Sequence, residues 1–292
     1  MGVSVVFSRL WPIELLTHFR LQEMAGLLVL SLLFLFLKQF RVTISLLILT
    51  IFSMLLVPGF HSESPRESPV ETGTVVKILH LNTSARQKPV IRALNRSPSQ
   101  PDLVLLNEAP KQIESYLRKH QREYKKFFTL FKGEDELAVI SKKPLKNKDV
   151  VKLKGINQHL LQMTVPVRNR DITIWMGHSA PPVFPYHFYR RNRFLRKLRR
   201  KLHSLHKPDV FVGDINVTPG SPYFQDIVSN SHWSYAGKGD PFLYTWHSQI
   251  PILSTALDHV LYRKPVTVKK HRVLPGVGSE HYPVYAELGL QH

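Results

Sequence analysis

Two long apolar runs lie within the first sixty residues, and they constrain the fold of this chain more than any other feature. The first reads MAGLLVLSLLFLFL from Met24 to Leu37, and the second reads VTISLLILTIFSMLLVPGF from Val42 to Phe60. A segment of about 20 apolar residues is long enough to cross a bilayer. The two runs, joined by KQFR, therefore predict a membrane hairpin in residues 1–60, with spans at about 21–37 and 42–58.

A cleavable signal peptide is the alternative interpretation of these residues. The apolar material is longer than a signal peptide needs, Lys38 and Arg41 split it, and no clear small-x-small cleavage site follows. If these two basic residues face the cytoplasm, both termini lie on the other side of the membrane. We therefore expect retention in a membrane, with the rest of the chain extracytoplasmic.

The remainder of the chain divides into a linker and one strongly basic domain. Residues 61–73 read HSESPRESPVETG, which is polar and typical of a linker, and residues 74–292 form the predicted folded domain. The first sixty residues contain four basic and two acidic side chains, so nearly all of the formal net charge of +19 belongs to the domain. Such a charge favours phosphate-rich partners, either nucleic acid or anionic lipid. The chain has no cysteine, so disulfide content gives no indication of the cellular compartment in either direction.

Polar side chains recur where strand-like apolar runs of this domain begin or end. Each one alone is more often a turn residue than a catalyst. Six such positions follow one another along the chain, which favours a shared site. They are Asn82, Glu108, His178, Asp214 with Asn216, Asp258, and Glu280 with His281.

The stretch VFVGDINVTPGSP illustrates the pattern. Side chains two apart in an extended chain point the same way, so Asp214 and Asn216 are expected to project together where the strand ends. Pro219 and Gly220 then turn the chain, and Ser221 is suited to cap the next helix.

The ordered motifs HLN, PDLVLLNE, GHS, GDIN, LDH and GSEHYPV resemble those of the endonuclease/exonuclease/phosphatase superfamily, whose members are divalent-metal phosphodiesterases and phosphatases. The resemblance extends roughly from Val75 to Leu288. It implies a four-layered α/β sandwich, with two mixed β-sheets packed face to face, helices outside and the site at one end. The apolar runs and LDHVLY are similar to the membrane-anchored bacterial branch of the family, which implies the bacterial inner membrane.

The resemblance also implies a metal site. Glu108 is the expected principal ligand, with Asn82 nearby and Glu280 completing the set. Oxygen ligands without cysteine favour Mg²⁺ or Mn²⁺ over Zn²⁺.

The family pattern assigns the remaining polar residues to catalysis. His281 is the expected general base or electrostatic partner, and Asp258 holds its imidazole in one tautomer. Asp214 would orient or deprotonate the attacking water, and Asn216 would donate to the phosphoryl group. His178 would contact the same phosphate. Whether Asp214 or His281 is the base stays open at this point.

Two positions depart from the family pattern. Glu280 stands where the family usually has Asp, and its extra methylene would move the carboxylate by about 1.5 Å. Asn107 replaces the more usual Gln before the metal-binding glutamate, which is expected to alter only the bonds around the ligands.

A basic amphipathic helix is predicted over residues 187–207. Phe188, Leu195, Leu198, Leu202 and Leu205 form its apolar stripe, and the basic residues between them, Arg191 included, mostly occupy the rest of its surface. This density of arginine slightly favours contact with phosphate or an anionic membrane over a merely solvated helix.

The substrate remains open between nucleic acid and a phospholipid or sphingolipid headgroup. A membrane anchor raises the effective concentration of the enzyme at the bilayer, which a nuclease does not need. A catalytically impaired, basic, membrane-tethered adaptor is the alternative from another class of function, motivated by Glu280 and the charge.

Overall fold

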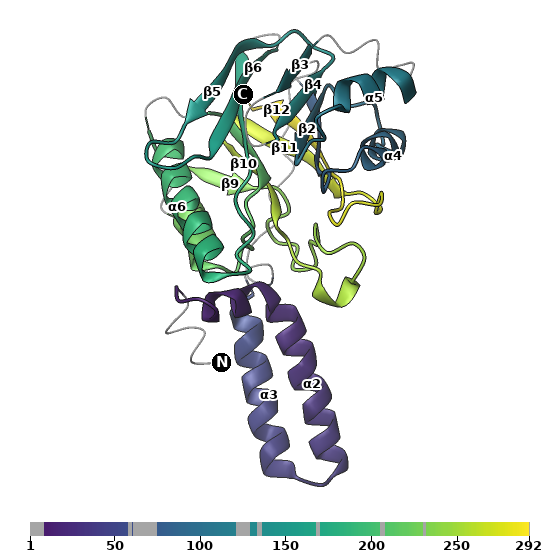
Figure 1. Cartoon of the computed structure of the whole chain (residues 1–292). Coiled ribbons are helices and arrows are strands. Elements are labelled where there is room, and N and C mark those ends of the chain that lie inside the picture. Colours follow the sequence, from purple (N-terminus) through teal and green to yellow (C-terminus); the bar gives the residue numbers. More distant parts are fainter. Residues whose placement is uncertain are drawn as a thin grey trace.

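The structure is a computed structural model. It describes residues 9–57, 60, 75–120, 129–132, 136–167, 170–204, 208–229 and 232–291, so the predicted linker at 61–73 lies outside it. The described chain forms two six-stranded sheets with helices outside, and two further helices project from one end (Figure 1).

The first sheet has the strand order β11-β12-β1-β2-β4-β3. It is mixed, because β1 runs parallel to β2 and antiparallel to β12. Its strands are β1 (Val76–Asn82), β2 (Leu103–Asn107), β3 (Thr129–Lys132), β4 (Ala138–Ser141), β11 (Val266–Val273) and β12 (Val284–Leu290).

The second sheet has the order β5-β6-β7-β8-β10-β9. It too is mixed, since β7 runs parallel to β8 whereas β10 is antiparallel to β8. Its strands are β5 (Lys146–Lys152), β6 (His159–Pro166), β7 (Asp171–Gly177), β8 (Val210–Asp214), β9 (Trp233–Tyr235) and β10 (Asp258–Arg263).

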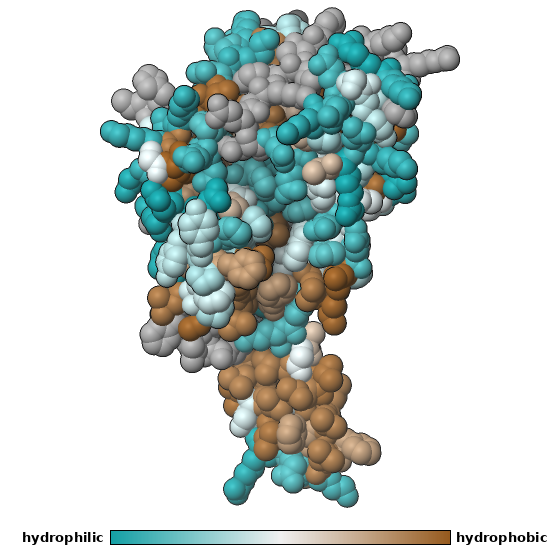
Figure 2. Space-filling view, in the orientation of Figure 1, coloured by the Kyte–Doolittle hydropathy of each residue, from teal (hydrophilic) through white to brown (hydrophobic). Residues whose placement is uncertain are grey.

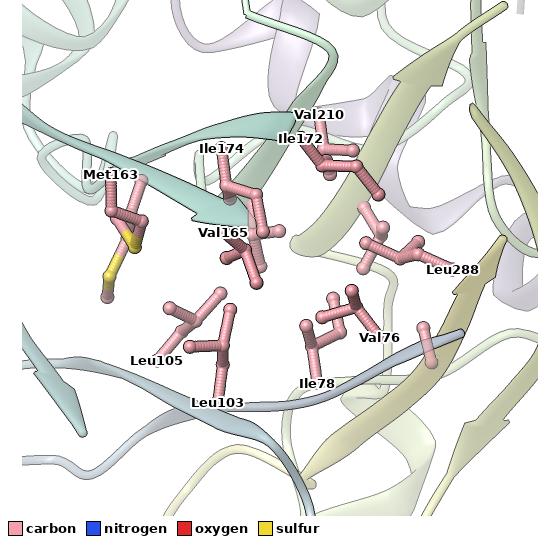
Figure 3. Close-up of a cluster of buried hydrophobic side chains, with 14 of the residues drawn as sticks. Val76, Ile78, Leu103, Leu105, Met163, Val165, Ile172, Ile174, Val210 and Leu288 are labelled. Atoms are coloured by element: carbon pink, nitrogen blue, oxygen red, sulfur yellow. The ribbon is translucent and has the colours of Figure 1, made fainter. Parts of the chain in front are cut away.

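The main core lies between the two sheets. Alternate residues of β1 and β2, such as Ile78 and Leu105, point toward Val165 and Ile174 of the opposite sheet (Figure 3). All four side chains are fully buried. A strand presents successive side chains to opposite faces, so the other residues of the same strands remain available for a helix layer.

The helices cover the outer faces of both sheets. Helices α4 (Lys88–Arg96) and α5 (Ile113–His120) pack on the first sheet, and α6 (Pro185–Leu202) and α7 (Pro222–Val228) pack on the second. This arrangement confirms the predicted four-layered α/β sandwich.

Helix α6 corresponds to the predicted basic helix, with one correction. It begins at Pro185 and ends at Leu202, and the four stripe residues Phe188, Leu195, Leu198 and Leu202 are buried as predicted, while Leu205 lies outside the described residues. Arg191, which was assigned to the exposed surface, is fully buried. Its charge is neutralised by a residue from a distant part of the sequence.

That residue is Glu14, in the short 3-10 helix η1 (Ile13–Phe19), which docks on the domain. The Glu14 carboxylate accepts a hydrogen bond from Arg191 Nη2 at 2.8 Å and another from the hydroxyl of Ser221, the N-cap of α7. An exposed ion pair between Arg9 and Asp226, 2.8 Å long, adds to the contact. The segment that precedes the apolar helices is therefore built into the domain.

Helices α2 (Arg20–Phe36) and α3 (Phe40–Leu55) follow η1 and lie side by side, away from the sandwich (Figure 1). The helical segment Ile13–Phe36 has 24 residues and contains an 18-residue window with a mean hydropathy of 1.7, so by length and composition it is long and apolar enough to cross a membrane. Helix α3 is apolar but shorter.

The polarity of this helix pair is inverted relative to a soluble hairpin. The buried residues of α3 all carry hydroxyls, namely Thr43, Thr50 and Ser53, and Ser31 of α2 is buried as well. The large apolar side chains point outward instead, as the brown surface of the two helices in Figure 2 shows. Small and hydroxyl-bearing residues at the helix contact with apolar residues outside are typical of helices in lipid.

Candidate active site

The predicted site residues gather at the end of the sandwich that adjoins η1. Asn82 ends β1, Glu108 follows β2, His178 follows β7 and Asp214 ends β8. Both strand pairs are parallel, β1 with β2 and β7 with β8, so their carboxyl ends lie at the same edge of each sheet. Asp258 opens the antiparallel strand β10 directly opposite Asp214 in register.

Asn107 fastens the two sheets together at this edge. Its Oδ1 accepts the backbone N–H of Asp214 at 2.9 Å, and its Nδ2 donates to the carbonyl oxygen of Gly177 at 3.3 Å. Gly213 lies so close to that carbonyl that any Cβ at position 213 would collide with it. Asn107 therefore sets the distance between the first sheet and the ends of β7 and β8, which gives a physical role to this departure from the family pattern.

Asn82 connects the two carboxylates at the centre of the site. Its Nδ2 donates to Glu108 Oε1 at 2.9 Å and to Asp214 Oδ2 at 3.0 Å. Its own Oδ1 accepts the backbone N–H of Ser84. One amide nitrogen thus lies within hydrogen-bond distance of both carboxylates, which brings their oxygens to a common point.

Left-handed backbone at two positions turns the polar side chains toward the site. Glu108 has φ 48° and Asn216 has φ 50°, values that non-glycine residues seldom adopt. The expectation that Asp214 and Asn216 share an extended strand is therefore wrong, because β8 ends at Asp214. The Asn216 backbone N–H instead donates to Asp214 Oδ1 at 3.0 Å, and its Nδ2 donates to the Ser179 carbonyl. A turn, rather than strand alternation, brings the two side chains together.

His281 is held by Asp258, as the family pattern implies. Its Nδ1 lies 2.8 Å from Asp258 Oδ2, and its Nε2 lies 3.6 Å from Asp214 Oδ2. The other Asp258 oxygen lies 3.0 Å from Nε2 of His80, a buried histidine that sequence reasoning missed. His80 contacts the Leu105 carbonyl through Nδ1, so it anchors Asp258 to the first sheet.

His178 reaches the same point from β7. Its Nε2 lies 3.6 Å from Glu108 Oε1 and 3.6 Å from Asp214 Oδ2. These distances exceed hydrogen-bond length, and within the described residues this buried nitrogen has no hydrogen-bond partner. Buried polar atoms are normally paired, so an unpaired one in a cluster of carboxylates indicates a position where a ligand binds.

The electrostatics of the cluster separate the roles of its members. Burial would lower the pKa of His281, but the carboxylates of Asp258 and Asp214 outweigh it and raise that pKa to about 9. Burial raises the pKa of Asp214 above its ordinary value, although the nearby His281 imidazole opposes this. For Asp258, the two histidines overcome burial and hold its pKa well below its usual range. In this state His281 is an imidazolium at neutral pH and Asp214 is the more basic carboxylate.

Metal-free protein should become less stable between pH 6.5 and pH 9 because of His281. The unfolded histidine titrates near 6.5 and the folded one near 9, so in this window the folded state binds the extra proton and its stability falls as pH rises. The loss attributable to His281 is about 3 kcal/mol. Urea unfolding in EDTA at both pH values, for wild type and His281→Asn, measures it. Equal losses in the two proteins would contradict this assignment.

A pocket of about 390 Å³ opens over this cluster. Glu280 lines it together with Glu108, Asp214, Asn216 and His281. The Glu280 side chain makes no hydrogen bond or ion pair with any other residue that the structure describes, so its carboxylate is available to a ligand. The donor atoms of Asp214, Asp258 and His281 all lie within 4.8 Å of one another.

Comparison of the sequence with models of known protein families identifies the family to which this site belongs. The model described as the Endonuclease/Exonuclease/phosphatase family matches residues 78–281, which include every predicted site residue. The chain belongs to the endonuclease/exonuclease/phosphatase family. This confirms the family resemblance of the motifs and places the protein among phosphate-ester hydrolases.

Solved structures agree on the fold of this family member. A humanized D. rerio TDP2 has a TM-score of 0.58 and 16% identity, over 74% of this chain and 99% of that one. The human Nocturnin catalytic domain with bound sulfate has a TM-score of 0.57 and 17% identity, over 80% of this chain and 98% of that one. An endonuclease/exonuclease/phosphatase from Beutenbergia cavernae has a TM-score of 0.57 and 19% identity, over 74% of this chain and 72% of that one. No curated protein matches the sequence significantly.

The donor set of this endonuclease/exonuclease/phosphatase chain fits a hard divalent cation. Glu108 and Glu280 present carboxylates at the pocket, and Asn82 lies beside Glu108, with its Nδ2 2.9 Å from Glu108 Oε1. Mg²⁺ and Mn²⁺ prefer such oxygen ligands. The Asp214, Asp258 and His281 group suits a cation less well, because both His281 nitrogens face carboxylates and its raised pKa keeps it protonated.

Proposed function

We propose that this protein is a membrane-anchored, Mg²⁺- or Mn²⁺-dependent hydrolase of phosphate diesters. The observation that carries the proposal is the arrangement around Asp214 Oδ2, which lies 3.6 Å from the imidazole nitrogens of both His178 and His281 and 3.0 Å from Asn82. A basic carboxylate beside an imidazolium supplies both a proton acceptor and a positive charge, which attack of water on phosphorus requires.

Glu108, Asn82 and Glu280 would hold the metal. When bound, a divalent cation neutralises a phosphoryl oxygen and stabilises the charge that develops as water attacks. Glu108 suits this role because its side chain is 35% exposed at the pocket, so substrate can reach an ion held there.

The remaining residues orient the water and the phosphate. Asp214 accepts the proton of the attacking water while the new oxygen–phosphorus bond forms and the bond to the leaving alkoxide breaks. His281, held through Nδ1 by Asp258, keeps its Nε2 toward the reacting group and balances the charge on the phosphoryl oxygens. The directions of the pKa shifts favour Asp214 over His281 as the base.

The membrane anchor is the second part of the proposal. Helices α2 and α3 expose large apolar side chains along their length and bury hydroxyls, which supports two spans rather than a packed soluble hairpin. Lys38 lies in the turn between the helices and Arg41 in the first turn of α3, so both are at the tip of the pair. If that tip faces the cytoplasm of a bacterium, the catalytic domain lies outside it.

Turnover of bis(p-nitrophenyl) phosphate by the purified full chain in detergent tests the chemistry. We expect hydrolysis with Mg²⁺ or Mn²⁺ and none in EDTA. A protein that folds, binds the metal and hydrolyses no diester would favour the alternative of a basic, membrane-tethered adaptor.

Metal binding itself has a readout that does not depend on activity. Mg²⁺ or Mn²⁺ at about 100 times its dissociation constant should stabilise the folded protein by about 2.7 kcal/mol and raise its melting temperature. Glu108→Ala should remove this rise. Glu114→Ala, an exposed glutamate on α5, is the matched control and should keep it. An unchanged rise in Glu108→Ala would exclude Glu108 as a ligand.

A further inference from the structure

The pocket over the active site has a second wall that the family motifs do not supply. Leu15, His18 and Phe19 of η1 line it opposite the catalytic cluster, together with residues 181–183. The docking of η1 that brings them there rests on Glu14 and Arg191, both fully buried. The segment leading into the apolar helices is thus part of the active site.

This wall directly precedes the apolar helices in the chain. Phe19 is followed at once by Arg20, where α2 begins. On the other side, Val183, Phe184 and Tyr186 are 60%, 63% and 69% exposed, although large apolar side chains are usually buried. Figure 2 shows apolar surface on the part of the domain that adjoins the two helices.

The short helix η4 (Pro251–Leu253) lies beside the first turn of α2, because Gln22 donates to the Ser254 carbonyl at 2.8 Å. Ile252 of η4 is 74% exposed. Exposed Val183, just before α6, therefore lines the pocket, and exposed apolar residues of η4 lie beside the first turn of α2. Such exposed apolar residues are typical of a surface that rests on or dips into the interface of a bilayer.

We infer that the pocket takes a phosphate ester carried by a membrane lipid, with the phosphate at Asp214 and His281 and the apolar part of the lipid along Leu15, Phe19 and Val183. This inference rests on the proposed function and specifies its substrate. Because Phe19 of this wall directly precedes α2, a lipid in the same bilayer as α2 would lie close to the pocket. A nucleic acid would instead leave the apolar wall without a partner.

The test compares three probes with the full chain reconstituted in detergent–lipid micelles and Mg²⁺. The first probe is the lipid of the micelles, which is phosphatidylcholine, sphingomyelin and phosphatidylglycerol in equal parts. The second is bis(p-nitrophenyl) phosphate, and the third is a single-stranded DNA. We expect kcat/KM for one of the lipids to exceed that for the soluble diester by about 100-fold, because remote apolar contacts contribute to binding in the transition state. Faster cleavage of DNA than of any lipid would overturn the inference and leave the proposed hydrolase intact.

Variants of the wall provide the second arm. Leu15→Ser with Phe19→Ser should lower the ratio of lipid to soluble-diester turnover about ten-fold, and Val183→Ser on the opposite side should lower it in the same direction. Leu16→Ser is the matched control, since Leu16 lies on η1, is 56% exposed and does not line the pocket. An unchanged ratio in the wall variants would overturn the inference, whereas no turnover of any probe by wild type would overturn the proposed function itself.

Discussion

Replacing Glu14 by alanine should lower the free energy of unfolding of the full chain by about 3–5 kcal/mol. Glu14 and Arg191 are both fully buried and meet at 2.8 Å, so the substitution leaves a buried guanidinium without its counter-charge. Ser221 would lose a hydrogen-bond acceptor at the same time. Urea unfolding in detergent, followed by tryptophan fluorescence, measures the change.

Asp226→Ala is the matched control. Asp226 also pairs the segment before α2 with the domain, through Arg9, but the two side chains are 35% and 51% exposed. An exposed pair of this kind contributes about 0–1 kcal/mol. Glu14→Leu combined with Arg191→Met should recover only part of the loss, because an apolar pair can replace the buried ion pair but not the hydrogen bond from Arg191 to the Asn216 carbonyl. A Glu14→Ala effect no larger than that of Asp226→Ala would show that the docking of η1 does not depend on this pair.

The same substitution should also reduce catalysis. Arg191 Nη1 donates to the backbone carbonyl of Asn216 at 3.0 Å, and the Asn216 N–H in turn donates to Asp214. Arg191 thus holds the left-handed turn that aims Asp214 and Asn216 at the pocket. Glu14 acts on the site through this arginine, so it is a positioning residue.

The second large effect is expected for Asp214→Asn, which should lower kcat about 10²–10⁴-fold at an unchanged fold. Asparagine has the shape of aspartate and can still hydrogen-bond to Asn82, but it cannot accept a proton from water. The measurement is hydrolysis of the soluble diester at saturating Mg²⁺, at a temperature below the melting temperature of the variant.

Asp209→Asn is the control for a general effect of removing a buried carboxylate. Asp209 lies just before β8, at the opposite end of the strand from Asp214, and pairs with Arg170 and Arg263. Its replacement should change kcat by less than about two-fold after correction for folded fraction, since it is remote from the chemistry. The double variant Asp214→Asn with His281→Ala should be little worse than the worse single variant, because residues that act as a unit are not additive. Fully additive losses would contradict a shared role.

The sandwich could be predicted because local patterns specify it. Successive side chains of apolar runs such as LVLLN face the core and the helix layer in turn. The strands of the structure end where turn residues follow these runs in the sequence. The polar residues at those ends were found for the same reason. Parallel neighbours place them at one edge, so chain order and strand ends were enough to bring Asn82, Glu108 and Asp214 into one site.

His80 and Arg191 could not be predicted because their roles depend on distant partners. His80 lies inside β1 and has the pattern of a core residue, while its partner Asp258 is 178 positions away. Arg191 belongs to a row of arginines that suits an exposed helix face, and only the docking of η1 buries it. Helical periodicity describes which side of a helix faces the sheet, and it contains no information about a segment that arrives from elsewhere.

Strand alternation predicts that His259, next to Asp258, points away from the catalytic face. It is buried, packs against Phe224 and contacts the Val217 carbonyl at 2.7 Å. Burial lowers its pKa to about 4, so it is a neutral core residue. Strand alternation succeeded here because Asp258 and His259 both lie within β10, whereas it failed at Asn216, which lies beyond the end of β8.

The docking of η1 also changes how the domain is tethered. The chain leaves α3 and re-enters the domain at β1, which is the covalent connection. Arg9, Glu14 and Gln22 form a second, non-covalent connection on the other side of the helix pair. A cut between residues 60 and 75 would therefore leave the domain attached to the helix pair through these contacts, and separating the two would require a denaturant as well as the cut.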